Sequence, residues 1–580
     1  GGFIGWVNRK TRQIRLIQPQ SDSSEKLRWN WNTPIHLSAT HPGTIYIGSQ
    51  YLFRSSDAGQ SWQRLSPDLT TNDKEKQKQE ESGGITVDNS AAEMHTTIYS
   101  ISESPVDASV IWVGTDDGNL QLSRNGGKTW SNLIRNVKGL PANSWVSWVE
   151  ASRHNASTAY ATFDRHTFGD MDPHVFKTTD FGRSWTRIAG KSQGLRGYAH
   201  VIREDSVSPN ILFVGTEFGL WISIDGGAQW AQFKGGNLPN VAVRDMVVQA
   251  RDNDLVIATH GRGIWIIDDI TPLRSLNLKL LQEEAAFVSQ RPTRQRILGF
   301  GGWPEGDASY SGENPTGGAV ITYYQRTRHL FGDLKIEILD SDGKVLDTVP
   351  ASKRRGLNRV TWAMRAKPPL VPPAASVAGS STQGPRVVPG AYTVRMTKNN
   401  KVYETKLIVD LDRRADYTVQ DRQVQFNEAQ RVSGMFGQIT GLIMRINQVR
   451  GSAEMSMEKA EGDARLTAQL KNLSDKADEI RKKIVATKEG GDITGEERIR
   501  ENLDNLFGML LFYEGKPSEN VIARADELQR EIDAASKEFD ALVSNDVPAV
   551  NQLLKGRDLP PLSVPPAGPL SETLSSREAE

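Results

Sequence analysis

Hydrophobic residues follow two different periods along this chain. Over residues 1–274 they come in short alternating runs interrupted by glycine-rich turns, as in "VIWVGTDDGNLQLS" and "ILFVGTEFGLWIS", which predicts β-hairpins. Short strands continue over residues 276–414, whereas apolar residues over 415–556 recur in steps of three and four, as in α-helices. The pattern therefore predicts a mainly β chain with an α-helical end, followed by a Pro/Ser-rich tail, residues 557–580, without regular structure.

An octet that ends in tryptophan recurs four times in the first region. "SRNGGKTW" follows the order Ser/Thr-x-Asp/Asn-x-Gly-x-(Ser/Thr/Gln)-Trp, and so do "SSDAGQSW", "TTDFGRSW" and "SIDGGAQW". The four tryptophans lie 45 to 68 residues apart, and one four-stranded propeller blade needs about 40–50 residues. We therefore expect each octet at the hairpin between the third and fourth strands of a unit with strands a, b, c and d.

Five such units, with residues 1–20 as the end of an earlier one, predict a β-propeller of about six blades or part of a larger one. The fifth unit carries a degenerate octet in "ATHGRGIWIIDDITPLR". In an octet the Asp or Asn can bind amides of its own turn, while the Trp packs between sheets. This interpretation makes the octets structural, through Asp57, Trp62, Asn125, Trp130, Asp180, Trp185, Asp225 and Trp230.

The octet resembles the Asp-box, or BNR repeat, of sialidases, xyloglucan-hydrolase propellers and sortilin. The longer runs "ESPVDASVIWVGTDDGNLQLSRNGGKTWSNL" and "VGTEFGLWISIDGGAQW" are similar to large secreted bacterial proteins of the sortilin-like or glycosyl-hydrolase-like repeat type. That resemblance implies an Asp-box propeller joined to a small β domain and a helical tail. It also implies an extracytoplasmic location, periplasmic or secreted, and it leaves the chemistry open.

The middle and last regions predict two further domains. About six strands over 276–414 indicate an immunoglobulin-like β-sandwich, interrupted by a mobile loop, "KPPLVPPAASVAGSSTQGPRVVPG". Three long helices and one shorter helix over 415–556 predict an antiparallel bundle, with a partner-binding helical surface as the alternative.

Composition removes several classes of function. The chain has 580 residues with 70 Lys plus Arg against 70 Asp plus Glu, and this balance argues against nucleic-acid binding. It has no cysteine, so disulfides and thiolate metal sites are excluded. No apolar run is long enough for a transmembrane segment. The first residues, "GGFIGWVNRK", contain neither Met nor a signal peptide, so we expect a fragment or a processed product.

Propeller geometry gathers polar residues at one edge, where the b–c turns meet the starts of the inner strands a. The carboxylates expected there, as catalytic residues of a hydrolase, are Asp116, Asp117, Asp164 and Glu217. The residues expected to bind ligand there are His95, Arg165, His200, Arg244, His260 and Arg262. The simpler interpretation is that these groups cap hairpins and pair between blades.

Two functions compete at this edge, which surrounds the mouth of the propeller channel. The leading hypothesis is recognition of a glycan or protein segment, with the appended domains contacting another protein or an envelope assembly. The alternative is a glycoside hydrolase with paired carboxylates, and a purely architectural subunit is a third class. A sialidase needs three arginines that bind one carboxylate. The sequence offers Arg203, Arg244 and Arg262 for this role, but nothing in it fixes their mutual geometry. No cofactor or metal site is predicted, because the oxygen-rich loop "DRHTFGDMDPH" is interpreted as solvated.

Overall fold

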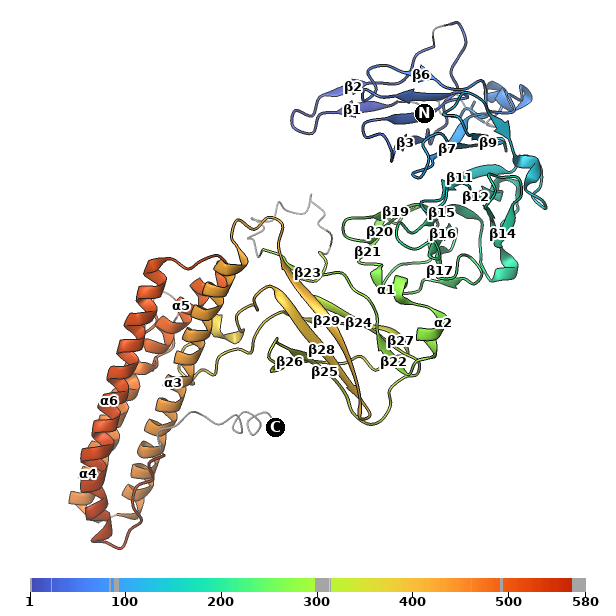
Figure 1. Cartoon of the computed structure of the whole chain (residues 1–580). Coiled ribbons are helices and arrows are strands. Elements are labelled where there is room, and N and C mark those ends of the chain that lie inside the picture. The colour runs from blue at the N-terminus through green and yellow to red at the C-terminus, as the bar shows by residue number, and fades with distance from the viewer. Residues whose placement is uncertain are drawn as a thin grey trace. The chain divides into compact units, whose positions relative to one another are not determined.

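The computed structural model describes residues 3–21, 23–82, 85–87, 93–297, 312, 314–460, 462–490 and 494–565. The chain divides into two compact units, which are described separately below (Figure 1). The first comprises residues 1–283 and 288–290, and the second comprises residues 284–287 and 291–580.

The first unit contains four small antiparallel sheets with four strands each, paired in the order a–b–c–d. The first two are β3 (Ile35–Leu37), β4 (Ile45–Gly48), β5 (Leu52–Ser55), β6 (Gln63–Arg64) and β7 (Ile98–Glu103), β8 (Ile111–Thr115), β9 (Leu120–Ser123), β10 (Ser131–Asn132). The next two are β11 (Trp145–Ala151), β12 (Ala159–Asp164), β13 (His174–Thr178), β14 (Thr186–Ala189) and β15 (Ala199–Glu204), β16 (Leu212–Thr216), β17 (Gly219–Ser223), β18 (Ala231–Gln232). These are propeller-like blades.

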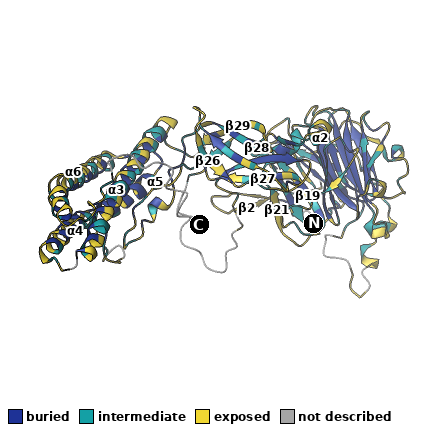
Figure 2. Cartoon of the chain, turned by 90° about the horizontal axis from the view of Figure 1, so that it is seen from below, coloured by how far each residue is buried: buried dark blue, intermediate teal, exposed yellow. Residues whose placement is uncertain are grey.

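The blades pack face to face through one repeated position. Strand b of each four-stranded sheet contributes a buried aromatic residue to the cluster that joins its sheet to the next one: Tyr46, Trp112, Tyr160 and Phe213. Their exposed fractions are 3% or less, and Figure 2 shows the blade strands largely in the colour of buried residues. Apolar burial between neighbouring sheets is therefore the main force that holds the series together.

The first unit also contains two incomplete sheets. The pair β1 (Gly5–Val7) and β2 (Ile14–Leu16) precedes the four blades, and β19 (Val243–Gln249), β20 (Asp254–Thr259) and β21 (Ile264–Ile267) follow them. We expected four strands in the fifth unit, but its sheet has three in the described residues, because the chain continues into α1 (Thr271–Ser275) and α2 (Leu278–Gln282). Ile264 of this sheet is 73% exposed, whereas Leu220, its counterpart in the fourth sheet, is fully buried.

The second unit begins with two sheets that share one core. One contains β22 (Ala285–Phe287), β24 (Ala319–Gln325) and β27 (Gly356–Trp362); the other contains β23 (Thr293–Gln295), β29 (Lys401–Leu411), β28 (Gly390–Lys398), β25 (Leu334–Leu339) and β26 (Val345–Val349). The second sheet is mixed, since β23 runs parallel to β29. Trp362 and Tyr392 meet across the two sheets with ring centroids 5.3 Å apart. The strands of this part start at Ala285, because the short helix α2 occupies the beginning of the predicted range 276–414.

The loop that we expected to be mobile, residues 367–390, lies against the helices of the same unit. The Asp504 carboxylate accepts hydrogen bonds from the backbone amides of Ser380 and Ser381 at 3.1 and 2.8 Å. Arg500 donates to the carbonyl oxygen of Pro372, and Thr440 donates to that of Leu370. The expectation of a free loop is wrong because side chains of the helices satisfy the backbone groups of this Pro-rich segment.

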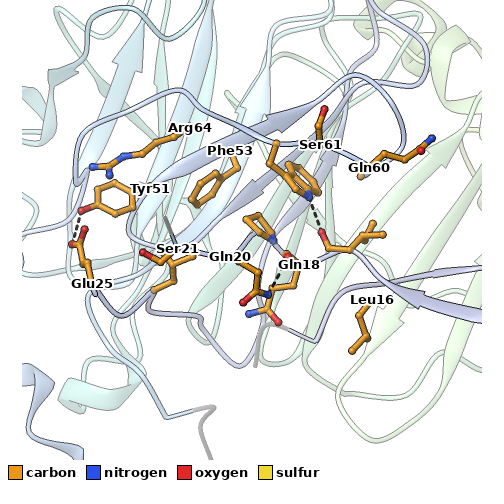
Figure 3. Close-up of a pocket in the computed structure, with 15 residues that line it drawn as sticks. Leu16, Gln18, Gln20, Ser21, Glu25, Tyr51, Phe53, Gln60, Ser61 and Arg64 are labelled. Carbon is orange, nitrogen blue, oxygen red and sulfur yellow. Dashed lines mark hydrogen bonds between the residues drawn. The ribbon is translucent and has the colours of Figure 1, made fainter. Parts of the chain in front are cut away.

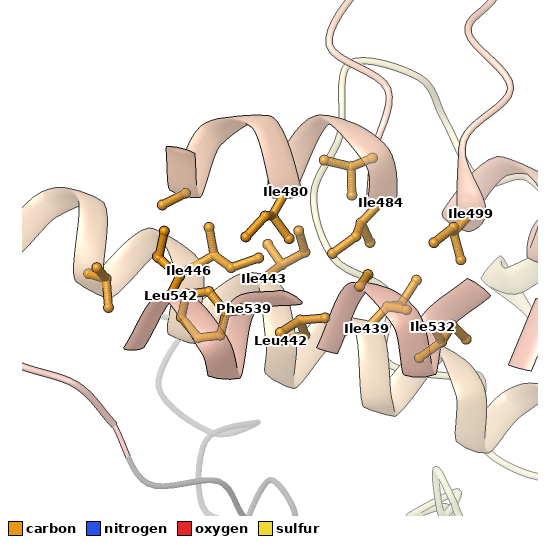
Figure 4. Packing of buried hydrophobic residues seen from close by; sticks show 14 of the residues in the cluster. Ile439, Leu442, Ile443, Ile446, Ile480, Ile484, Ile499, Ile532, Phe539 and Leu542 are labelled. Atoms are coloured by element: carbon orange, nitrogen blue, oxygen red, sulfur yellow. The ribbon is translucent and has the colours of Figure 1, made fainter. Parts of the chain in front are cut away.

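Four helices form the end of the second unit: α3 (Val419–Lys459), α4 (Ala464–Ile484), α5 (Ile499–Phe512) and α6 (Glu519–Lys555). The predicted apolar stripes form a single core in which Ile443, Ile480, Ile499 and Phe539 come from four different helices (Figure 4). A capping box between Thr418 and Asp421 begins α3. The first residues of the predicted tail also pack here, since Leu562 is 5% exposed and part of this core, while residues 566–580 lie outside the described residues.

Candidate functional site

The inner strands of four successive sheets each contain a β-bulge at the same place. The pairing with strand b shifts by one residue near the start of β7, β11, β15 and β19. The extra residues are Tyr99, Ser147, His200 and Arg244. Because a bulge redirects one side chain at the end of a strand, the repeated bulge builds a group of side chains at the b–c edge of the first unit.

Three of the four bulge residues contact one another. The Tyr99 hydroxyl lies 3.5 Å from Nε2 of His200, and Nη1 of Arg244 lies 3.3 Å from Nδ1 of the same histidine. Ser147 bonds instead to Thr162, which in turn donates to the carbonyl oxygen of His200. His200 is therefore the centre of the group.

Asp164, at the end of β12, holds this histidine in place. Its side chain is fully buried, and Oδ2 accepts from Nδ1 of His200 at 3.0 Å while Oδ1 accepts from Nδ1 of His166 at 2.5 Å. Arg244 lies 3.8 Å from the same carboxylate. Burial alone would raise the pKa of Asp164, but the hydrogen bonds from His200 and His166 outweigh it and hold the pKa below its ordinary value. The carboxylate can only accept, so Nδ1 of His200 carries a hydrogen and Nε2 faces Tyr99.

Aromatic rings surround the charged groups. Trp145 meets Tyr99 edge-on with centroids 4.6 Å apart and His200 at 5.5 Å. Tyr198 stacks on His166 at 4.6 Å, and its hydroxyl accepts from Arg244 at 3.1 Å. Burial lowers the pKa of His200 and raises that of Tyr198, so both rings are neutral at pH 7.

Asp116 and Asp117 lie in the b–c turn of the second sheet and are already bonded. Asp116 accepts from the Thr97 amide and hydroxyl at 2.8 and 2.6 Å and contacts Nδ1 of His95 at 3.4 Å. Asp117 accepts from the Thr71 amide at 2.7 Å, and burial raises its pKa. Burial also lowers the pKa of His95, but the hydrogen bond with Asp116 outweighs it, so the pKa is raised. The two carboxylates therefore link the b–c turn by hydrogen bonds to the segments that contain Thr97 and Thr71.

The other candidate residues are more scattered. Arg165 donates to Asp170 of its own loop at 3.1 Å and to the Ser144 hydroxyl, just before β11, at 2.9 Å. His260 and Arg262 are exposed in the β20–β21 turn. Glu217 is half-buried, and its Oε2 is buried without a hydrogen-bond partner in the described residues. Among all the residues that the structure describes, no group of three or more His, Asp or Glu side chains is arranged to hold a metal ion. In the same residues no helix is both long and apolar enough to span a bilayer.

The octets lie at the c–d hairpins, at the opposite end of the strands from the bulges. In the third octet Asp180 accepts from the Ser184 amide at 3.0 Å, and the Thr178 hydroxyl accepts from the Gly182 amide at 2.9 Å. Three of the tryptophans donate to a carbonyl of the preceding sheet or its connection: Trp62 to Ile17, Trp130 to Leu65 and Trp230 to Ile188. These contacts are structural.

Sequence reasoning named His200 and Arg244 but missed Tyr99, Ser147 and Tyr198. The available signal was a break in the alternation of apolar residues, as in "TIYSIS". Two residues, Tyr99 and Ser100, separate Ile98 from Ile101 there, where strict alternation would place one. The cavity drawn in Figure 3 lies elsewhere, beside the first octet, and has a volume of about 460 Å³.

No protein-family model and no curated protein match the chain. Solved structures with a similar fold include a GH74 enzyme from Niastella koreensis, with 13% identity over 42% of this chain and 36% of that one and a TM-score of 0.31. An ancestral GH74 enzyme matches with 12% identity over 66% and 45% and a TM-score of 0.29. YCF48 bound to D1 peptide matches with 14% identity over 45% and 70% and a TM-score of 0.30.

This chain spans less than half the length of the two GH74 enzymes. The likeness to these β-propellers is distant and concerns the fold alone.

Proposed function

We propose that the first unit is an Asp-box β-propeller whose b–c edge binds a glycan or an extended segment of a partner protein at the channel mouth. The observation that carries this proposal is the repeated bulge, which brings Tyr99, His200 and Arg244 from three sheets into one contacting group. Trp145 and Tyr198 add aromatic faces beside it. A few fixed polar groups among aromatic rings are typical of binding sites in which orientation and specificity matter.

Recognition is better supported than hydrolysis because three of the four candidate carboxylates already accept hydrogen bonds from other groups of the protein. A glycoside hydrolase needs two carboxyl groups facing one cleft, roughly 5–9.5 Å apart. Asp116, Asp117 and Asp164 are each 8% exposed or less, and their oxygens accept hydrogen bonds from neighbouring side chains and amides. Glu217 is the exception, since one of its oxygens has no partner in the described residues, and it keeps the hydrolase as the second candidate.

The test is a glycan array and a peptide library probed with the whole chain and with Arg244→Lys and Tyr99→Phe. Arg244→Lys keeps the positive charge but removes the planar guanidinium, and Tyr99→Phe keeps the ring but removes the hydroxyl. We expect binding to weaken about tenfold or more for Arg244→Lys, the loss of roughly one charged hydrogen bond, and about fivefold for Tyr99→Phe, the loss of a neutral one. Lys128→Ala, in an octet at the opposite edge, is the matched control. Binding that is unchanged in both site variants would show that the b–c edge is not the binding site.

Polysaccharide hydrolysis assays with wild type and Glu217→Gln separate the two candidate functions. Binding without turnover supports recognition. Turnover that is lost in a folded Glu217→Gln variant overturns it in favour of the glycoside hydrolase.

We further propose that the two sheets of the second unit form an immunoglobulin-like domain and that this domain and the helical bundle contact another protein or the cell envelope outside the cytoplasm. The resemblance of the octets to secreted bacterial propellers supports this location. Fractionation of native cells with an antibody against the chain tests it, because recovery of the protein in the cytoplasmic fraction contradicts the proposal.

A further inference from the structure

A second cavity of the first unit lies beside the b–c turn of the fourth sheet, the turn between β16 and β17. Its volume is about 490 Å³, and its lining includes two cations, two aromatic rings and two side-chain amides: Arg196, Lys234, Phe218, Phe233, Gln232 and Asn240. The lining contains no Asp, Glu or His. The charge that the cavity presents is therefore positive.

The loop after β18 turns away from the sheet and leaves room for this cavity. β18 ends at Gln232, whose side-chain amide donates to the Phe218 carbonyl at 2.9 Å. The Phe233 ring lies over Gly235, where an added Cβ would meet the ring at 2.8 Å, and Gly236 has a φ of +63°. Both positions favour glycine, so the sequence itself directs the turn that opens the space between the loop and the b–c turn.

The cavity adjoins the central group of the b–c edge. Tyr198 belongs to that group, and Arg196 of the cavity is two residues earlier in the chain. Between them, a Cβ added to Gly197 would lie 2.7 Å from Cβ of Glu217 and 3.0 Å from the Phe218 ring. The Glu217 amide also donates to the Tyr198 carbonyl at 3.1 Å. The cavity and the central group therefore lie side by side on the same edge.

The two cations of the cavity are not neutralised by acids of the protein. Arg196 and Lys234 are exposed, and neither forms an ion pair with a described residue. By contrast, Arg244 of the central group lies 3.8 Å from the Asp164 carboxylate. An anionic group of a ligand would therefore meet two charges that the described residues leave unpaired, and charge-assisted hydrogen bonds are the strong ones.

The uncharged part of the lining suits a sugar ring. Phe218 is 44% exposed and Phe233 is half-buried, so both rings are accessible in part. Asn240 is exposed, and its side chain makes no hydrogen bond to a described residue. An amide can both donate to and accept from hydroxyl groups, and pockets for small ligands combine apolar rings with a few such polar groups.

An extended peptide fits this place less well than a sugar. Peptides that add to a sheet are bound by a row of backbone groups along its edge strand. The edge strand here, β18, has two residues, Ala231–Gln232, and the chain turns away directly after it. The cavity therefore offers side chains rather than a strand edge.

We propose that this cavity binds an acidic sugar residue of a glycan, with its carboxylate or sulfate group held by Arg196 and Lys234 and its ring against Phe218. The inference rests on the proposed function, because it names the class of glycan that the b–c edge takes. Further sugars of the same chain lie toward Tyr198 and the central group.

The test measures binding of the whole chain by isothermal titration calorimetry. The probes are trimers of galacturonic, glucuronic and mannuronic acid and a sulfated galactose trimer, each beside its neutral form, the methyl ester or the desulfated sugar. We expect at least one acidic trimer to bind at least about tenfold more tightly than its neutral form, and this difference to shrink as salt is raised. The uronic acids and the sulfated sugar show which anionic group the cavity takes.

Arg196→Gln and Lys234→Gln remove one charge each at exposed positions, and each should weaken binding at least about fivefold. Lys234→Arg keeps the charge and should keep most of the binding. Lys128→Gln, an exposed cation of the second octet at the opposite edge, is the matched control and should bind as wild type does. Circular dichroism checks that all variants are folded.

Arg244→Lys separates this inference from the proposed function. Loss of binding in Arg244→Lys, with full binding in Arg196→Gln and Lys234→Gln, would assign the acidic group to the central group and overturn the inference while the proposed function stands. Loss in all three variants supports both, and loss in the two cavity variants alone supports this cavity and counts against the central group.

Three other results overturn the inference. One is that no acidic trimer binds, and another is that acidic and neutral trimers bind equally well. The third is that a hexaglutamate peptide binds in place of the trimers and is lost in Arg196→Gln, which would identify an acidic polypeptide as the ligand of the cavity.

Discussion

The indole ring of Trp112 meets that of Trp185 edge-on, with centroids 5.8 Å apart, across the interface between the second and third sheets. One ring comes from strand b, the other from the octet of the next sheet. This contact gives the tryptophan of the third octet a structural role, because it packs against the sheet that precedes it.

Trp112→Ala should destabilise the first unit by about 3–5 kcal/mol, because the side chain is fully buried and its removal leaves a cavity. Urea unfolding followed by tryptophan fluorescence measures the change, since most of the 14 tryptophans lie in residues 1–283. Trp31→Ala, at a site that is 69% exposed, should change the free energy of unfolding by no more than about 0.5 kcal/mol. Equal effects would refute the role assigned to the interface.

The stability of the first unit should fall as the pH drops below about 6.5. Burial lowers the pKa of His200, His36 and His174 in the folded state, so the unfolded chain binds protons first and is favoured as the pH falls. Above pH 7 these rings are neutral in both states, and their effect vanishes. His95, whose pKa is raised, acts in the opposite direction.

His200→Gln should flatten this dependence without removing it. Urea midpoints at pH 5, 6, 7 and 8 for wild type and variant measure the effect. A wild-type curve that is level between pH 8 and 5 would contradict it.

Glu514→Gln should destabilise the second unit by about 3–5 kcal/mol. Glu514 is buried and lies 2.9 Å from Arg386, and the neighbouring Arg365 and Arg422 have pKa values lowered mainly by burial. Without the carboxylate the three guanidinium groups repel one another. The double variant Arg386→Met, Glu514→Gln should recover part of the loss when it is compared with both single variants in a double-mutant cycle measured by denaturation. Additive effects would show that the pair is not coupled.

Asp504→Ala should release the segment of residues 367–390 from the helices, because it removes the acceptor of the Ser380 and Ser381 amides. Subtilisin should then cleave within this segment at least several-fold faster than in wild type, as followed by mass spectrometry. Asp540→Ala, on the exposed face of α6, is the control. Rapid cleavage of the wild-type chain would mean that the segment is free.

Local signals were sufficient for most elements of this fold, although in the described residues α1 and α2 follow β21 where the sequence predicted a fourth strand. The octets predicted the c–d hairpins because Asp, Gly and Trp encode a turn and its anchor within eight residues, and the steps of three and four over 415–556 predicted the four helices. The contacts between segments far apart in the chain could not be predicted from such local signals. The loop over 367–390 looked free because Pro, Ser and Ala carry no periodicity, while the groups that hold it, Asp504 and Arg500, lie more than a hundred residues away.

The sequence by itself determined that this protein is a series of small β-sheets followed by further β-strands and a helical region, since hydrophobic period and turn chemistry act over a few residues. Only the tertiary structure decided which side chains form a site. A bulge is a property of two paired strands, so the grouping of Tyr99, His200 and Arg244 appears only once the register of each sheet is fixed.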